Sequence, residues 1–384
     1  MSKYVIDETT LTAIGDAVRE KDGSTEGILV SQLAAKIKNI PQGGGGEDLP
    51  DEAFVITGNC HYRFAHNGWN WFIDMYGNKI TTKDIRNATQ MFANSDIENI
   101  PFALNFWQGT DYIDCTYLFS TNSKLKTVPV MNNFKPGQFQ YIFYSCTALT
   151  NVDAILAWDL GRIQTYNYSN CSNLFAYCYS LRSVPEEFLK NIGCSVKTSY
   201  SQSHLYSLFE NCYCLDEIRG LSPVTGRITS NTLGTTARKC MRLKDLLFMT
   251  NEDGTPWVAE WKAQVLDLSV NTGYAPSKQS FYTLNPTDIS EDKEVKDDAS
   301  YQALKNDPDW FATSIDYSRY NHDSAVNTIN SLPDTSAYLA SAGGTNTIKF
   351  AGAAGALTDG GAINTMTEEE IAVAAAKGWT VSFA

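Results

Sequence analysis

The chain has 384 residues, a formal net charge of −13 and 43% hydrophobic residues. This length fits two or three domains, with enough apolar side chains for a sizeable core. The acidic balance argues against nucleic acid or an anionic lipid surface as the main partner. No apolar run approaches the ~18 residues of a membrane-spanning helix, so no membrane insertion is expected. Because the first residues lack the apolar segment of a signal peptide, we expect a protein made and assembled in the cytoplasm.

Residues 1–40 predict a small helical module. Apolar side chains fall at helical spacing in two short segments: Leu11, Ile14 and Val18 in the first, Leu33 and Ile37 in the second. Two short helices bury little, so the module needs a partner or self-association. A hairpin folded back on the body is the alternative. Residues 41–50, rich in Gly, predict a flexible linker that disfavours this alternative.

Residues 51–90 predict strands joined by turns. Aromatic and polar residues alternate after Gly68, and Gly77 with Asn78 indicates a tight turn. We interpret this region as a β cap that closes the N-terminal end of the following repeats.

Residues 91–247 contain a recurring phrase: an apolar residue, Phe, two variable residues, a small polar residue or Cys, two more, Leu, two more, then Ile or Val. Four copies keep the full spacing: Phe119, Asn122, Leu125 and Val128; Phe143, Cys146, Leu149 and Val152; Phe175, Cys178, Leu181 and Val184; Phe209, Cys212, Leu215 and Ile218. The copy at Phe92 is one residue short, and the last copy has Ala237 in place of Phe. Such recurrence predicts a stacked solenoid with a narrow parallel sheet made of one short strand from each copy. Pro follows the phrase in three copies and would end the strand there. An ordinary globular core in which Phe and Leu recur by chance is the alternative.

Cysteine shares one position of the phrase. Cys146, Cys178, Cys212 and Cys240 follow the Phe position by three residues. We interpret them as small buried side chains with free thiols. Neither the Cys nor the four His show the spacing of metal ligands, so no metal and no cofactor are predicted.

Residues 248–384 predict three features: a hairpin, a charged excursion and a C-terminal cap. The hairpin turns at residues 251–254 and places Trp257 and Trp261 on its return strand; the excursion covers residues 285–312. The cap contains a strand at 347–350 and a helix that begins with a capping box of Thr367 and Glu370. Gly378 ends this helix, and a last strand begins at Trp379.

The recurring phrase resembles the bacterial surface leucine-rich repeats of the BspA type. The resemblance implies a right-handed parallel solenoid used for adhesion and interaction. The expected fold class is therefore an α+β leucine-rich-repeat solenoid with a β cap at its N-terminal end, preceded by the helical module and followed by an α/β cap. The irregular copy lengths and the missing Phe of the last copy depart from the family pattern.

Two further stretches resemble bacteriophage proteins. Residues 11–25 and 31–40 are similar to the N-terminal module of phage tail-fibre, baseplate and head-fibre proteins, and residues 371–381 to the ending of phage leucine-rich-repeat proteins. This implies a non-enzymatic virion protein, tail-fibre-like or receptor-binding, that forms homo-oligomers and binds other virion proteins through Leu11, Ile14, Val18, Leu33 and Ile37. A head-fibre or decoration protein and a bacterial surface adhesin stay open as alternatives.

Tyrosines in the insertions between copies are the predicted ligand-binding residues. The insertions between copies combine Tyr with Ser, Asn and Gln, which is typical of adaptable recognition loops; their tyrosines are Tyr166, Tyr168, Tyr200 and Tyr206. We expect these residues to contact a host cell-surface glycan or protein, the alternative being that they pack across the loops. No nucleophile elbow, phosphate loop or metalloprotease motif occurs, and a capsule depolymerase is the alternative function.

Overall fold

The structure is a computed structural model that describes residues 54–109, 113–138, 140–160, 171–192, 205–222, 227–240, 243–269, 320, 322–350 and 366–383. The chain divides into two units, Met1–Asp51 and Glu52–Ala384, and every described residue belongs to the second. The predicted helical module, linker and charged excursion lie outside the described residues.

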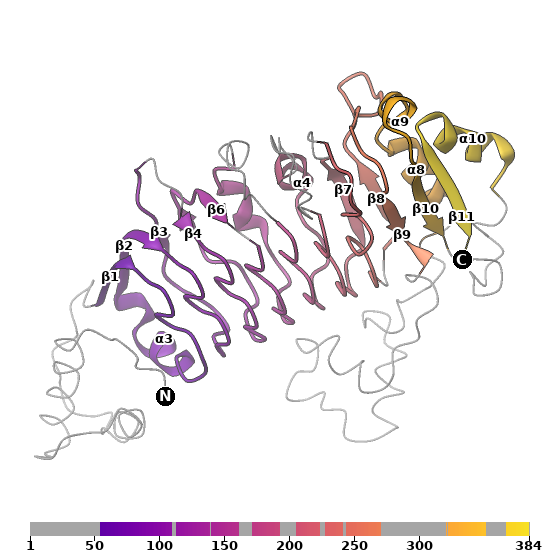
Figure 1. Cartoon of the computed structure of the whole chain (residues 1–384). Coiled ribbons are helices and arrows are strands. Elements are labelled where there is room, and N and C mark those ends of the chain that lie inside the picture. Colours follow the sequence, from indigo (N-terminus) through magenta and orange to yellow (C-terminus); the bar gives the residue numbers. More distant parts are fainter. Residues whose placement is uncertain are drawn as a thin grey trace, which may run out of the picture. The chain divides into compact units, whose positions relative to one another are not determined.

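The described part is an α/β protein with several small sheets whose strands are all parallel (Figure 1). The largest sheet has the order β1-β2-β4-β6: β1 (Phe54–Asn59), β2 (Ile80–Asn87), β4 (Ile113–Asp114) and β6 (Pro136–Gln138). The others are β11-β10-β9, β3-β5 and β7-β8: β3 (Leu104–Asn105), β5 (Met131–Asn132), β7 (Glu217–Leu221), β8 (Asp245–Phe248), β9 (Val265–Asp267), β10 (Asn346–Phe350) and β11 (Trp379–Phe383).

The helices of the described part are short. They are α3 (Asn70–Tyr76), η1 (Gly77–Lys79), η2 (Asp153–Ala157), α4 (Glu186–Ile192), α8 (His322–Ser331), α9 (Ser336–Ala342) and α10 (Glu368–Ala376), with η denoting 3₁₀-helix. None of them combines the length and the apolar character that a membrane span requires.

A ladder of stacked phenylalanines runs through the core. Neighbouring ring centroids lie 5.2–5.7 Å apart, and neighbouring ring planes differ by at most 18°. The six rings are buried: Phe64, Phe92, Phe119, Phe143, Phe175 and Phe209. The recurring phrase therefore places its Phe residues in one continuous aromatic stack. We call each ladder Phe, with its flanking turns, a layer.

Backbone hydrogen bonds join successive layers. The N–H of each ladder Phe donates to the carbonyl of the residue before the next Phe, or before Ala237 in the last case, at 2.7–3.1 Å. The residues two before and two after each ladder Phe have positive φ: Tyr62 and His66, Gln90 and Asn94, Tyr117 and Thr121, Tyr141 and Ser145, Asn173 and Tyr177, Ser207 and Asn211. Each layer thus passes the ladder in the same turn conformation. We call the outer surface of these turns the turn face.

The predicted short strands form in two copies, as β7 and β8; two other copies share only an isolated bridge, and residues 181–184 form no strand. Ile218 in β7 pairs with Leu246 in β8, and Thr127 forms a parallel bridge with Asn151. These residues lie in the Leu-x-x-Val part of the phrase, where parallel pairing was expected.

The prediction of strands at residues 51–90 is confirmed at β1 and β2 and wrong between them, and the region does not form a separate β cap. Strand β1 pairs in parallel with β2, and Phe64 is the first ring of the ladder, so this region forms a layer of its own. The aromatic stretch after Gly68 is helix α3 rather than a strand. Its aromatic residues also fit helical spacing, and they pack on Phe54: the ring centroid of Phe72 lies 5.2 Å away and that of Tyr76 5.7 Å away.

The C-terminal region confirms the predicted helix and strands. Thr367 and Glu370 form the capping box of α10, Gly378 follows the helix with φ +82°, and β11 pairs in parallel with β10. The predicted hairpin is limited to one antiparallel bridge, Thr250 with Pro256. Trp261 instead forms a parallel bridge with Ile228, and β9 pairs in parallel with β10.

Candidate ligand-binding surface

Six tyrosines form a continuous row across the turn face. Successive ring centroids lie 4.7–6.3 Å apart in the order Tyr117, Tyr141, Tyr144, Tyr177, Tyr179 and Tyr213. The row begins two residues before a ladder Phe, at Tyr117 and Tyr141, and ends four residues after one, at Tyr213. It therefore runs diagonally over four layers. We call this group the tyrosine row.

The tyrosine rings of the row are held by contact with one another. Tyr117 and Tyr141 are stacked at 4.7 Å and 13°, whereas Tyr141 and Tyr144 meet edge to face at 5.5 Å. All members except the buried Tyr213 are partly exposed. Rings fixed in this way offer apolar faces to a ligand at a low cost in side-chain entropy.

The hydroxyl groups of Tyr141 and Tyr144 stay protonated at neutral pH. Partial burial raises the pKa of Tyr141 above its usual value, and the nearby Tyr117 and Tyr206 raise it further. Partial burial likewise raises the pKa of Tyr144, with contributions from Tyr177, Tyr141 and Glu210. These two hydroxyl groups therefore keep both a hydrogen-bond donor and acceptor lone pairs.

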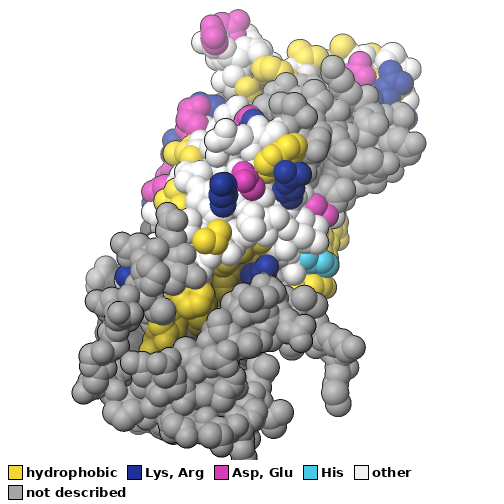
Figure 2. Space-filling view, turned by 90° about the vertical axis from the view of Figure 1, so that its left-hand side faces the viewer, with side chains coloured by type: hydrophobic (Ala, Val, Ile, Leu, Met, Phe, Trp, Pro, Cys, Tyr) yellow, Lys and Arg dark blue, Asp and Glu magenta, His cyan; other side chains and the backbone are white. Residues whose placement is uncertain are grey.

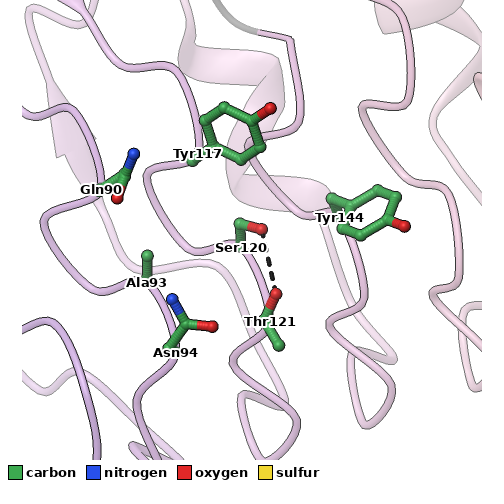
Figure 3. A pocket seen from close by; sticks show the side chains of 7 residues that line it. All are labelled: Gln90, Ala93, Asn94, Tyr117, Ser120, Thr121 and Tyr144. Carbon is green, nitrogen blue, oxygen red and sulfur yellow. Dashed lines mark hydrogen bonds between the residues drawn. The ribbon is translucent and has the colours of Figure 1, made fainter.

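A cavity of about 270 Å³ lies beside the first tyrosine of the row (Figure 3). Three successive layers line it with Gln90, Ala93, Asn94, Tyr117, Ser120, Thr121 and Tyr144. Its rim offers amide and hydroxyl groups together with aromatic rings, and none of the lining side chains is charged. Ser120 Oγ and Thr121 Oγ1 lie 3.3 Å apart within it.

Charged groups lie at the far end of the row. The Glu210 carboxylate accepts a hydrogen bond from Ser207 Oγ at 2.7 Å and lies 3.8 Å from the Arg238 guanidinium. Figure 2 shows another part of the surface, the side of the molecule at the left of Figure 1. Basic and acidic side chains of the described residues are interspersed there rather than gathered by sign.

Of the predicted ligand-binding tyrosines, the structure describes only Tyr206. Its side chain is exposed, and its carbonyl accepts a hydrogen bond from Asn173 N–H at 3.0 Å. Its phenol group also contributes to the raised pKa of Tyr141, a member of the tyrosine row. Tyr166, Tyr168 and Tyr200 lie outside the described residues, as do the predicted attachment residues Leu11, Ile14, Val18, Leu33 and Ile37.

The tyrosine row itself was not predicted from the sequence, because recognition residues were expected only in the insertions. Tyr117, Tyr141 and Tyr177 lie within two residues of a ladder Phe. A simple signal was present: Tyr occurs two residues before the Phe position in two successive copies, at Tyr117 and Tyr141.

The cysteines of the phrase form a buried column behind the turn face. Cys146, Cys178, Cys212 and Cys240 are fully buried free thiols. Each Sγ donates to the carbonyl of the Phe position one layer before, at 3.0–3.2 Å. Burial raises the pKa of all four thiols well above the usual value, so none is a thiolate nucleophile at neutral pH.

No cluster of three or more His, Cys, Asp or Glu suited to a metal ion occurs within the described ranges. One histidine–carboxylate pair joins two helices: His322 Nε2 of α8 lies 3.1 Å from Glu370 Oε2 of α10. The Glu370 carboxylate also belongs to the capping box of α10, which gives this pair a structural role.

Comparisons with known proteins add no family: no family model matches the chain, and no similar curated protein or solved structure was found.

Proposed function

We propose that this chain is a non-enzymatic bacteriophage virion protein, tail-fibre-like or receptor-binding, whose layered body attaches to the host surface. In this proposal the body is a right-handed leucine-rich-repeat solenoid of the BspA type. The Phe ladder and the parallel sheets support the solenoid. The phage assignment depends on the resemblance of residues 11–25, 31–40 and 371–381.

The tyrosine row is the observation that carries the binding role. Buried aromatic ladders stabilise a fold, whereas the partly exposed tyrosines of the row continue across three layers outside the buried core. Tyr is enriched at binding surfaces because it combines a large apolar face with a hydroxyl group. The row and the neighbouring cavity supply both apolar faces and hydroxyl groups, which fits a host-surface glycan or protein as the partner.

Attachment to bacterial cells tests the proposal. Purified protein is mixed with a panel of bacterial strains, and bound protein is measured after sedimentation of the cells. Losing one well-placed aromatic side chain costs a binding site ~2 kcal/mol or more. Tyr141→Ala with Tyr177→Ala should therefore weaken attachment more than tenfold. Unchanged attachment by this folded variant would contradict the proposed site.

Tyr168→Ala with Tyr200→Ala is the matched comparison. If this pair weakens attachment and the first does not, the contact lies in the insertions rather than in the row. Assay of the same cells for released reducing sugar separates binding from capsule depolymerisation, since a binding protein releases none.

The attachment module needs its own test. Deletion of residues 1–40 should leave cell attachment intact but prevent incorporation into virions. Incorporation of the truncated protein would place the docking surface in the body. A bacterial adhesin would instead be found on the surface of the cells that encode it.

A further inference from the structure

We propose that the cavity between the Phe92, Phe119 and Phe143 layers is a subsite for a single neutral sugar ring, a hexopyranose or an N-acetylhexosamine. This inference depends on the proposed binding function and specifies the ligand class of one part of its surface.

The cavity exists because one layer interrupts an otherwise aromatic surface. Two residues before the ladder Phe, the first, third and fourth layers carry Tyr62, Tyr117 and Tyr141, all with φ of 59–60°. The second layer carries Gln90 at this position, also with positive φ. The smaller and flexible Gln90 leaves open the space that a fourth tyrosine would occupy.

The Tyr117 ring forms an apolar wall. Tyr141 covers one face of this ring by stacking at 4.7 Å. The same ring lines the cavity together with Gln90 of the preceding layer. An aromatic ring that is supported by a neighbouring ring suits the apolar C–H face of a sugar ring.

The parts of the cavity away from the Tyr117 ring supply polar groups. No hydrogen bond involves the side-chain amides of Gln90 or Asn94 within the described part of the chain, so both are available to hydroxyl groups of a ligand. Ser120 places a hydroxyl at the cavity although its side chain is 5% exposed. With no cation or anion in the lining, an uncharged ligand with many hydroxyl groups is favoured over an acidic sugar or a phosphate.

The residue type at one turn position also sets this layer apart. Thr121 has φ 59° and is the one β-branched residue with positive φ in the described ranges. This conformation is strained for a β-branched side chain. Strained residues that persist in a fold cluster at ligand sites. Thr121 lines the cavity beside Ser120, which is where such a site is proposed.

The size of the cavity limits the ligand. About 270 Å³ is less than the 300–1,000 Å³ typical of sites for drug-sized molecules, so one ring fits rather than an oligosaccharide. A single ring held by a few contacts is expected to bind in the millimolar range.

Gln90→Tyr tests the subsite because it fills the cavity with a side chain that the fold already accepts at this position in three other layers. Binding of glucose, galactose, mannose and N-acetylglucosamine to the full chain is measured by ligand-detected nuclear magnetic resonance, with glucuronic acid as a charged comparison. We expect at least one neutral sugar to bind the original protein more tightly than glucuronic acid does, and Gln90→Tyr to weaken its binding at least tenfold.

Lys239→Tyr is the control, since Lys239 has φ 60° and lies two residues after the last Phe position, far from the cavity in the layer order. It should leave sugar binding unchanged. Equal sugar binding by Gln90→Tyr, or no binding by any of the four neutral sugars, would overturn the subsite. The proposed function fails separately, when the original protein attaches to none of the bacterial strains.

Discussion

Asn122 breaks the pattern of the buried column, and replacing it should stabilise the protein. The next four layers place Cys at this position, and each thiol donates to a Phe-position carbonyl. Asn122 is fully buried, yet its Nδ2 and Oδ1 find no hydrogen-bonding partner among the described residues. A buried polar group without a partner costs about 1–3 kcal/mol.

The substitution Asn122→Cys removes both unpaired groups and hardly changes the side-chain volume, so little cavity is created. The new thiol would face the Phe92 carbonyl by analogy with Cys146, whose Sγ lies 3.1 Å from the Phe119 carbonyl. Allowing for partial relaxation around the amide, we expect the free energy of unfolding to rise by about 2 kcal/mol.

The reverse exchange is the matched control. Cys146→Asn removes a satisfied thiol and buries an amide in the same surroundings one layer later, so the free energy of unfolding should fall by about 2 kcal/mol or more. Urea unfolding followed by tryptophan fluorescence gives the midpoint and the slope for each variant. The slope should stay constant, because the surface exposed on unfolding is unchanged.

Two results would refute the reasoning. If Asn122→Cys is no more stable than the original protein, the Asn122 amide is satisfied in solution and its burial carries no penalty. If Cys146→Asn is neutral, the column accepts an amide at any layer and the thiol bonds contribute nothing measurable.

Three further predictions concern the cysteines, the C-terminal network and pH. The buried column should resist alkylation in the native protein, because burial raises the pKa of its thiols and blocks access to Cys146, Cys178, Cys212 and Cys240. All four thiols should react fully in denaturant without reductant. A disulfide between any two of them would contradict the column. The fully buried Gln264 accepts hydrogen bonds from Thr232 N–H and Oγ1 and donates to the Ser230 and Lys262 carbonyls. Gln264→Met should therefore lower the free energy of unfolding, measured in urea, by about 4 kcal/mol. A loss below 1 kcal/mol would show that these groups find other partners. Glu370 raises the pKa of His322 above 6.5, so the stabilisation from this histidine is complete below that pH and is lost as the pH rises through its folded pKa. The Glu370 pKa is lowered below 4.5, chiefly by the Thr367 backbone N–H, so the stabilisation from this carboxylate is present above pH 4.5 and lost in acid. Because the stabilisation from His322 is lost as the pH rises, His322→Gln should reduce the difference in urea midpoint between pH 5.5 and pH 8.5. An unchanged difference would contradict the pairing of His322 with Glu370.

The ladder could be predicted from the sequence because its signal is local. Phe119, Phe143, Phe175 and Phe209 each begin a phrase whose spacing is fixed by one turn conformation, and that conformation recurs in every layer. The Phe64 layer was missed because helix α3 follows the turn and replaces the Leu-x-x-Val part of the phrase.

The C-terminal pairing could not be predicted in the same way. Leu266 in β9 pairs with Ile348 in β10, which pairs with Val381 in β11. Parallel partners that are far apart in the chain leave no local spacing to recognise. The antiparallel turn at Thr250 was visible, but it did not determine where Trp261 would pair.

Predicting the candidate surface requires both the sequence and the stacking order of the layers. The outward direction of Tyr117 and Tyr141 follows from their place two residues before a ladder Phe, which the sequence shows. The cavity depends on how Gln90 packs beside Tyr117 in the next layer, and only the stacking order of the layers reveals it.

Thr121 connects the stability of the turn face with its proposed use. Asn94 and Asn211 occupy the equivalent place, two residues after the ladder Phe, with φ of 53° and 61°. Asn tolerates positive φ far better than a β-branched residue does. Thr121→Asn should therefore raise the free energy of unfolding by about 1 kcal/mol.

The same change should weaken sugar binding, because it removes the Thr121 methyl and hydroxyl groups from the cavity wall and separates the hydroxyl pair with Ser120. Ser145→Asn is the control: Ser145 has φ 62° at the equivalent place, does not line the cavity and is not β-branched. Ser145→Asn should change the free energy of unfolding less than Thr121→Asn does, and it should leave sugar binding intact. A Thr121→Asn variant that is less stable than the original protein would show that the threonine conformation is not strained. A variant that is more stable and binds sugar equally well would show that the strain has no part in recognition.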